Sequence, residues 1–236
     1  MVIRAIHGLW RVFAYALAAL VAIFALYQGW FLLHILYWVN HDPASTHVME
    51  TRLRVLREKN PRAELEHRWV PYGRISAHLK RAIIVAEDAK FIDHEGFDWE
   101  GIQRAMEKNQ RRGKIVAGGS TITQQLAKNL FLSGERSVLR KAQEAVITAM
   151  LEAAMDKRRI LEIYLNVAEW GEGVFGAEAA ARHYFGVPAA GLSDEQAARL
   201  AAMLPRPRFY DRNRGSPYLA RYAETIQARM PGAQVP

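Results

Sequence analysis

Two glutamates lie where their neighbours would alter their acid–base chemistry, and Glu87 is the first. Helical spacing in the stretch HLKRAIIVAED puts Glu87 at the edge of an apolar face that carries Leu79 and Ile83. A carboxylate beside apolar side chains tends to have a raised pKa, which suits a general acid or base. The same spacing predicts that Asp88 faces solvent. An ordinary acidic helix end, with both carboxylates solvated, is the alternative.

Glu144 is the second, because two cations precede it within one helical turn. Arg140 lies four residues before it and Lys141 three, so both can pair with it on one helix. A structural salt-bridge cluster is one interpretation, but cations gathered near a carboxylate also suit a pyrophosphate leaving group. Helical periodicity places Ile147 and Leu151 on the side of Arg140 and Glu144. It predicts a core face made of Val138, Ala142, Ala145, Val146, Ala149 and Ala153.

The stretch GGSTITQQLAKN, from Gly118 to Asn129, is rich in polar groups. If a helix begins at Thr121, one polar face carries Thr121, Gln124, Gln125 and Lys128. The glycines allow close backbone approach, and the hydroxyl, amide and ammonium donors fit a sugar bearing phosphates. A solvated surface helix is the alternative, and no phosphate-binding P-loop is present because no Gly-Lys-Ser/Thr follows.

A metal site is not predicted. His94 and Glu95 lack the second histidine of an HExxH motif, and no other grouping has ligand spacing. Taken alone, His94 is predicted to be a structural histidine near a turn.

The elements that must position these residues are mostly helices. Ser76 is a plausible N-cap, and strand-like alternation is scarce. A loop with high mobility is expected at 111–119, and a charged helical piece is expected in VMETRLRVLREKN. Helices are predicted over 76–89, 100–111, 121–130, 137–155, 157–170 and 193–203.

The N-terminal segment predicts a membrane anchor. No Asp, Glu, Lys or Arg occurs from Val12 to Val39, and about 20 apolar residues suffice to cross the hydrocarbon core. Arg4 and Arg11 precede this run, which favours a cytoplasmic N-terminus. A cleaved signal peptide is less consistent with so long an apolar run.

Charge and cysteine content narrow the class of protein. All 24 acidic residues and 30 of the 32 basic residues follow Asn40, so that part carries a net charge of +6. A basic body tethered to a membrane suits anionic headgroups or a phosphorylated substrate, and a location across the membrane argues against nucleic acid. The absence of cysteine fits an envelope protein without disulfides.

Four motifs, EDAKFIDHEG, GGSTITQQLAKN, RKAQE and KRRILEIYLN, together resemble the glycosyltransferases that polymerise peptidoglycan glycan strands. GEGVFGAEAAARHYFG and LAAMLPRPRFY are also similar to that family. The resemblance runs from about Trp69 to Tyr210 and is closest to the monofunctional biosynthetic peptidoglycan transglycosylases. We therefore expect no transpeptidase domain of the kind that bifunctional penicillin-binding proteins carry.

The resemblance implies a mostly α, lysozyme-like glycosyltransferase domain with a small membrane-proximal jaw lobe, preceded by one N-terminal transmembrane helix. The implied organisation is a cytoplasmic N-terminus at 1–11, a transmembrane anchor at 12–39, a connector at 40–60 and the glycosyltransferase domain at 61–236. It implies a single-pass protein of the inner (cytoplasmic) membrane whose catalytic domain is periplasmic.

The resemblance also implies the reaction. Lipid II is the acceptor, and the lipid-linked growing strand is the donor. Glu87 deprotonates the acceptor's 4-hydroxyl, which attacks the donor's anomeric carbon with inversion and releases undecaprenyl pyrophosphate. Glu144, the second catalytic residue, orients the sugar and the cations that stabilise the pyrophosphate. The implied substrate-binding residues are Asp88, Phe91, His94, Gly119, Ser120, Thr121, Gln124, Gln125, Lys128, Asn129, Arg136, Arg140 and Lys141.

Two other functions remain open from sequence: a lysozyme-like lytic enzyme that cleaves peptidoglycan, and a non-catalytic scaffold that binds lipid II. No cofactor is required by the sequence, although a divalent cation often assists members of the family. The expected partners are lipid II, the lipid-linked glycan strand and the membrane, with other cell-wall synthases and division proteins as further candidates.

Overall fold

The computed structural model describes residues 2–114, 118–132, 134–135 and 137–236, with side chains from residue 10 onward. The described chain divides into two compact units, Met1–His41 and Asp42–Pro236. The predicted mobility of the loop at 111–119 concerns in part residues 115–117, which lie outside the described residues. The domain boundaries inferred from the sequence stay a prediction.

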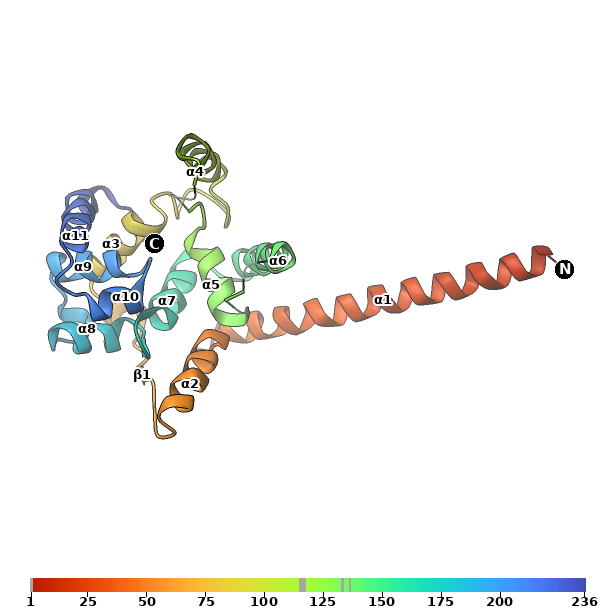
Figure 1. Cartoon of the computed structure of the whole chain (residues 1–236), viewed down its shortest axis with the longest axis horizontal. Coiled ribbons are helices and arrows are strands. Elements are labelled where there is room, and N and C mark those ends of the chain that lie inside the picture. The colour runs from red at the N-terminus through yellow and green to blue at the C-terminus, as the bar shows by residue number, and fades with distance from the viewer. Residues whose placement is uncertain (1, 115–117, 133, 136) are drawn as a thin grey trace. The chain divides into compact units, whose positions relative to one another are not determined.

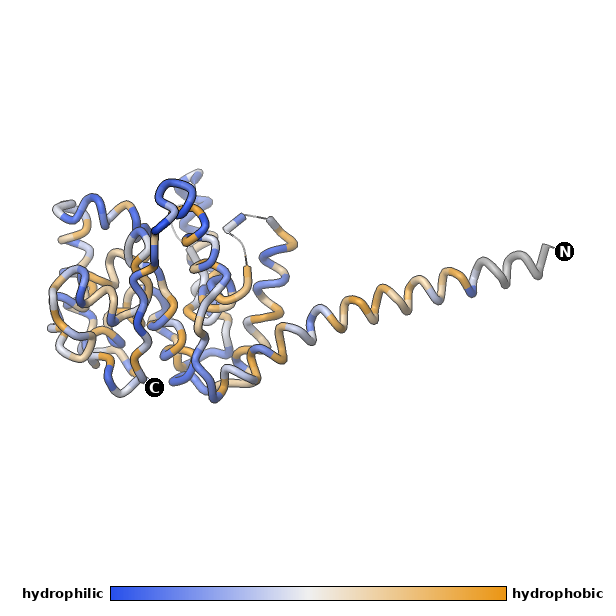
Figure 2. The backbone as a smooth tube through the Cα atoms, turned by 90° about the horizontal axis from the view of Figure 1, so that it is seen from below, coloured by the Kyte–Doolittle hydropathy of each residue, from blue (hydrophilic) through white to orange (hydrophobic). Residues whose placement is uncertain are grey.

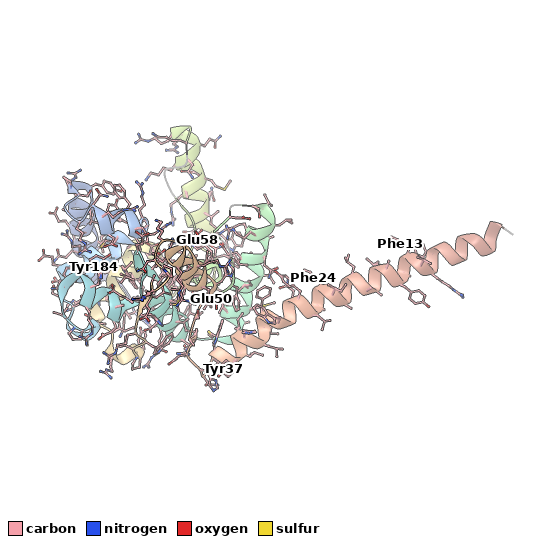
Figure 3. All side chains as sticks on the ribbon, turned by 60° about the horizontal axis from the view of Figure 1, so that its bottom comes forward. Phe13, Phe24, Tyr37, Glu50, Glu58 and Tyr184 are labelled. Carbon is pink, nitrogen blue, oxygen red and sulfur yellow. The ribbon has the colours of Figure 1, made fainter. Side chains whose placement is uncertain are left out.

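The first unit is built on α1 (Val2–Trp38), a single helix that is mostly apolar over Trp10–Trp38 (Figure 2). Phe13, Phe24 and Tyr37 lie along this helix (Figure 3), and each side chain is more than half exposed. The segment Trp10–Trp38 is long and apolar enough to cross a membrane by length and composition. The predicted N-terminal apolar helix is therefore confirmed.

The second unit is mostly helical, as the sequence predicts (Figure 1). Within it, α9 packs on α3 and α11, while α5 packs on α6 and α7. The α-helices are α2 (His47–Lys59), α3 (Ala77–Glu87), α4 (Trp99–Arg112), α5 (Ile122–Phe131), α6 (Val138–Ala154), α7 (Lys157–Val167), α8 (Ala177–Phe185), α9 (Asp194–Met203), α10 (Pro207–Arg212) and α11 (Pro217–Arg229). Short 3₁₀ helices are formed by η1 (Tyr72–Arg74), η2 (Ala189–Gly191) and η3 (Met230–Gly232).

Side-chain caps set where the predicted helices begin. Ser76 caps α3 as predicted, and its hydroxyl accepts a hydrogen bond from the backbone N–H of His78. Thr121, Ser137 and Ser193, predicted as first helical residues, are instead the N-caps of α5, α6 and α9. A hydroxyl at this position satisfies a free N–H of the first turn and contributes about 1 kcal/mol.

The predicted helix over 157–170 is wrong at its C-terminal end, because α7 stops at Val167. The chain then forms β2 (Glu169–Gly171) in a three-stranded sheet with β1 (Glu66–His67) and β3 (Val174–Phe175). The strand order is β1-β3-β2, with β1 and β3 parallel and β2 and β3 antiparallel. Trp170 is fully buried, and its indole N–H donates to the carbonyl of Leu200 at 3.1 Å. That tertiary contact favours extended backbone over another helical turn.

The predicted core face of α6 is also wrong. Val138 is 86% exposed and Val146 is 39% exposed. The buried side chains are instead Glu144, Ile147, Thr148 and Leu151. The helix is apolar on most sides, so its periodicity does not distinguish the two faces, and packing against α5 selects the face that carries Glu144.

Candidate active site

Glu87 lies at the last residue of α3, half-buried, where the helix meets α5. Nε2 of Gln125 donates a hydrogen bond of 2.7 Å to Oε2 of Glu87. The Oε1 atom of the same amide accepts a hydrogen bond of 3.0 Å from the hydroxyl of Tyr164, which is 1% exposed. Because Tyr164 donates to the amide oxygen, it leaves the amide nitrogen directed at Glu87. The three side chains thus form one hydrogen-bonded chain.

Burial raises the pKa of the Glu87 carboxyl above its usual value, and the nearby charge of Asp88 raises it further. The hydrogen bond from Gln125 and the charge of Lys128 partly oppose this shift. The sequence places Glu87 at the edge of an apolar helix face, and such a position is consistent with burial as the cause of the raised pKa. A carboxylate with a raised pKa accepts a proton more readily near neutral pH, so the site is suited to general acid–base chemistry.

Asp88 does not face solvent, and that prediction is wrong: the residue is only 7% exposed. Its Oδ2 accepts a hydrogen bond of 3.1 Å from the backbone N–H of Ile122, and its Oδ1 lies 2.9 Å from Nε2 of His94. A carboxylate at the N-terminus of α5 is electrostatically favourable. Asp88 thereby fastens the end of α3 to the start of α5. The predicted substrate contacts of Asp88 and His94 stay predictions.

Phe91 is another residue of this motif whose side chain is fully buried. The ammonium group of Lys157 lies 4.7 Å from the centre of its ring. The same ammonium group donates to the carbonyl of His94 at 2.5 Å and to Glu152 at 2.8 Å. The position of Phe91 indicates packing behind the site, and its predicted contact with substrate stays a prediction.

The start of α5 uses its polar groups to cap itself. The Thr121 hydroxyl accepts from the N–H of Gln124 and donates to the carbonyl of Gly96 at 2.7 Å, while Oε1 of Gln124 accepts from the N–H of Thr121. Both side chains are buried. A Cβ on Gly119 would lie 3.0 Å from Cα of Ile102. The absence of a side chain at Gly119 therefore allows α4 to pack closely against the segment that precedes α5. The predicted roles of these residues with substrate remain untested.

A cavity of about 520 Å³ extends between α5, α6, the end of α7 and the connection from α9 to α10. It is lined by the predicted residues Ser120, Gln124, Gln125, Lys128, Asn129, Arg140, Lys141 and Glu144, and also by Tyr164, Glu169 and Arg208. The structure therefore brings α5 and α6 side chains of two separate motifs to one cavity.

Cations outnumber carboxylates on the cavity wall. Glu144 accepts a hydrogen bond of 2.6 Å from Nη1 of Arg140 and a second from the ammonium group of Lys141, which confirms the predicted pairs. Glu169 pairs with Arg52 at 2.8 Å. Both wall carboxylates are thus neutralised, and the remaining positive charge favours an anion.

Two cationic groups in the cavity retain capacity for a ligand. Nε of Arg140 is a buried donor with no partner among the described groups, an arrangement that is rare in folded proteins. Burial lowers the pKa of Lys128; the charge of Arg140 adds to this shift, and the charges of Glu144 and Glu87 oppose it. An anion bound between them would satisfy the donor and offset the desolvation of the ammonium group.

A smaller cavity of about 150 Å³ lies on the other side of Ser120, which lines both cavities. Its acidic lining residues are Glu87, Asp88 and Asp98. Glu87 therefore borders this cavity, whereas its partner Gln125 borders the cationic one. Within the described part of the chain, no group of three or more acidic, histidine or cysteine side chains could hold a metal ion.

Arg136 lies outside the described residues, so its predicted cationic role stays a prediction. Sequence reasoning missed Tyr164 and Arg208 as wall residues. Both occur in segments quoted for the family resemblance, KRRILEIYLN and LAAMLPRPRFY. The resemblance alone did not assign them a role, because only the folded chain brings them beside Gln125 and Glu169.

Comparisons with known proteins identify the relatives of this chain. Residues 53–231 match the protein family described as Transglycosylase. The chain is 64% identical over 211 residues to the biosynthetic peptidoglycan transglycosylase of Janthinobacterium sp. (strain Marseille), covering 89% of this chain and 91% of that protein. It is 63% identical over 219 residues to the protein of the same name from Laribacter hongkongensis (strain HLHK9), covering 93% and 96%. The namesake from Nitrosospira multiformis is 59% identical over 227 residues, covering 96% and 97%.

Proposed function

Because the chain belongs to the peptidoglycan transglycosylase family, we propose that it polymerises glycan strands from lipid II. The lipid-linked growing strand is the donor, and lipid II is the acceptor. Undecaprenyl pyrophosphate leaves, and the anomeric configuration inverts from α to β in a single displacement. The observation that carries this proposal is the hydrogen bond between Glu87 and Gln125, because Gln125 lines the cavity whose wall is rich in cations.

Glu87 is the general base of the proposed reaction. Its carboxylate takes the proton of the acceptor's 4-hydroxyl as that oxygen bonds to the donor's anomeric carbon. The bond from this carbon to the pyrophosphate oxygen breaks, and its electron pair leaves with the pyrophosphate. The raised pKa of Glu87 supports this role, because it matches the carboxylate better to proton transfer near neutral pH.

The cations of the larger cavity stabilise the departing pyrophosphate. Lys128, Arg140 and Lys141 provide charge where negative charge develops, which is the kind of interaction that lowers a barrier most. The partnerless Nε of Arg140 supports this assignment. Glu144 holds two of these cations through its ion pairs and so orients them.

The donor occupies the cationic cavity, and the acceptor hydroxyl approaches Glu87 from the smaller cavity. This arrangement is supported by Ser120, which borders both, and by Gln125, which lies in the cationic cavity while it donates to Glu87. An inverting displacement needs attacking and leaving groups on opposite sides of the anomeric carbon. Approach of the donor and the acceptor from different cavities is consistent with that requirement.

The N-terminal helix anchors the protein in the inner membrane, with the N-terminus cytoplasmic and the catalytic unit periplasmic. The apolar length of Trp10–Trp38 supports this location, and Arg4 and Arg11 favour this orientation. The reaction as proposed requires no cofactor. A divalent cation, where one assists, would offset part of the charge of the substrate pyrophosphate.

The deciding experiment incubates the purified full chain with lipid II and follows polymer formation. Lengthened strands and released undecaprenyl pyrophosphate are the expected products. A lytic enzyme would instead shorten preformed strands and leave anhydro-sugar ends, and a scaffold would bind lipid II without turnover. Either result would overturn the proposal.

A further inference from the structure

A third pocket is lined by residues of α9, α10 and α11, and no role was predicted from the sequence for its lining residues. Its volume is about 430 Å³. We call it the aromatic pocket; its aromatic lining residues are Phe209, Tyr210, Tyr218 and Tyr222. Both α10 and α11 pack on α9 (Figure 1), and the rings come from these two helices: Phe209 and Tyr210 from α10, Tyr218 and Tyr222 from α11.

The aromatic pocket neighbours the catalytic cavity. Pro205, in the connection from α9 to α10, lines both. Burial raises the pKa of Tyr222, and the charge of Glu87 adds to this shift, so the pocket lies within electrostatic reach of the catalytic glutamate. A chain-like ligand that fills the catalytic cavity would pass Pro205 and enter the aromatic pocket.

The chemistry of the pocket fits sugar rings. Tyr218 and Phe209 are 59% and 38% exposed, so part of each ring is accessible to a ligand. The Arg206 guanidinium lies 4.3 Å from the centre of the Phe209 ring and forms no ion pair with any residue that the structure describes. Aromatic faces bind the C–H faces of pyranose rings, and a guanidinium donates to hydroxyl and acetamido oxygens.

We propose that the aromatic pocket binds N-acetylhexosamine units of the growing strand, distant from the reacting end. This inference rests on the proposed function, because it assigns a place to the donor that the reaction uses. The pyrophosphate end of the donor lies at Lys128 and Arg140, and the older sugars pass Pro205 to reach Tyr218. The pocket therefore retains long donors between additions and does not contribute to the joining of two lipid II molecules.

The test uses the full chain in detergent micelles with Tyr218→Ala, Phe209→Ala and the double variant. Arg221→Ala is the matched control, because Arg221 is an exposed residue of α11 that does not line the pocket. With lipid II as sole substrate, the double variant is expected to join the first two molecules at the control rate and then release shorter strands. Tyr218→Phe, which keeps the ring, is expected to restore strand length.

A second measurement does not depend on turnover. A lipid-free glycan octasaccharide of alternating N-acetylglucosamine and N-acetylmuramic acid is titrated into each variant. Loss of a ring contact is expected to weaken its binding by about two- to tenfold. Binding and strand lengths equal to those of the control would overturn the inference, as would an equal loss of the first joining step. Octasaccharide binding that depends on Tyr218, in a chain that makes no polymer, would refute the proposed function and retain the glycan site.

Discussion

Nε2 of Gln125 donates a hydrogen bond of 2.7 Å to Oε2 of Glu87. The contact joins the end of α3 to the middle of α5 across 38 residues of sequence. It fixes the direction of a carboxylate whose burial raises its pKa. The proposed base is therefore held in position, and its pKa is shifted in the direction that favours proton transfer near neutral pH.

Replacing Glu87 with Gln tests the base directly. Glu87→Gln keeps the shape of the side chain and an oxygen that can accept from Gln125, so the fold is expected to survive. Loss of general-base help is expected to lower kcat by about 10²–10⁴-fold. The check is strand synthesis from lipid II beside melting temperature. A folded variant that polymerises normally would refute the assignment.

The same variant has a predicted effect on stability. Because the folded-state pKa of Glu87 is raised, ionisation of this residue disfavours the folded state, and that penalty is present once pH exceeds the folded pKa. Glu87→Gln cannot ionise, so its melting temperature at pH 8 is expected to equal or exceed that of the parent chain. At a pH below the usual value of a glutamate, the difference is expected to vanish.

Removing the hydroxyl of Tyr164 tests how Gln125 is held. Tyr164→Phe leaves the Gln125 amide free to turn, which weakens the hydrogen bond that lowers the pKa of Glu87. A several-fold fall in kcat is expected, together with an acid limb of the pH profile displaced to higher pH. Tyr184→Phe is the matched control, because its hydroxyl bonds to the carbonyl of Trp170 outside the cavity. An unchanged acid limb in Tyr164→Phe would contradict the proposed effect of the hydrogen-bonded chain from Tyr164 through Gln125 to Glu87.

The raised pKa of Glu87 and the lowered pKa of Lys128 together predict a bell-shaped dependence of kcat/KM on pH. Activity is expected to rise as Glu87 loses its proton, at a pH above the ordinary glutamate value of 4.5, because its pKa is raised. Activity is expected to fall at alkaline pH as Lys128 loses its charge, below the ordinary lysine value of 10.5, because burial lowers its pKa. Lys128→Arg keeps a charge at all these pH values and is expected to remove the alkaline limb alone. An alkaline limb that persists in this variant would assign it to another group.

Lys128 and Arg140 also test the leaving-group role. If they stabilise charge that develops on pyrophosphate, Lys128→Ala is expected to lower kcat as well as kcat/KM. Arg140→Lys is expected not to restore full activity, because an ammonium cannot reproduce the bidentate contact of a guanidinium with phosphate oxygens. If Arg140 merely pairs with Glu144, its variants lose stability while the folded fraction turns over normally. Melting temperature measured beside steady-state kinetics distinguishes the two cases.

Removal of the N-terminal helix tests the contribution of the anchor. A chain that begins near Asn40 is expected to fold, because Asp42–Pro236 forms a compact unit with its own contacts. Its rate on lipid II in detergent is expected to match that of the full chain. On lipid II in vesicles it is expected to be slower, because the anchor raises the local concentration of enzyme at the membrane. Equal rates on vesicles would show that the second unit reaches the membrane without the anchor.

The sequence alone predicted the residues that we propose carry the chemistry, and it determined most of the helices around them. Gly-Gly-Ser-Thr before α5 and the charge-free run from Val12 to Val39 are local signals, and local physics suffices to interpret them. The spacing of Arg140 and Glu144 within one helix also fixed their ion pair, because both lie on the same turn. These features require no knowledge of distant contacts.

The tertiary structure decided which faces are buried and which groups remain free. Periodicity pointed Asp88 to solvent, yet the N-terminus of α5 offers an N–H that captures its carboxylate. The face of α6 that carries Val138 was exposed, because α5 packs on the opposite side. Tyr164 reaches Gln125 across 39 residues, and Pro205 lines two cavities. Such relationships depend on packing between segments that are distant in sequence, and no local periodicity carries that information.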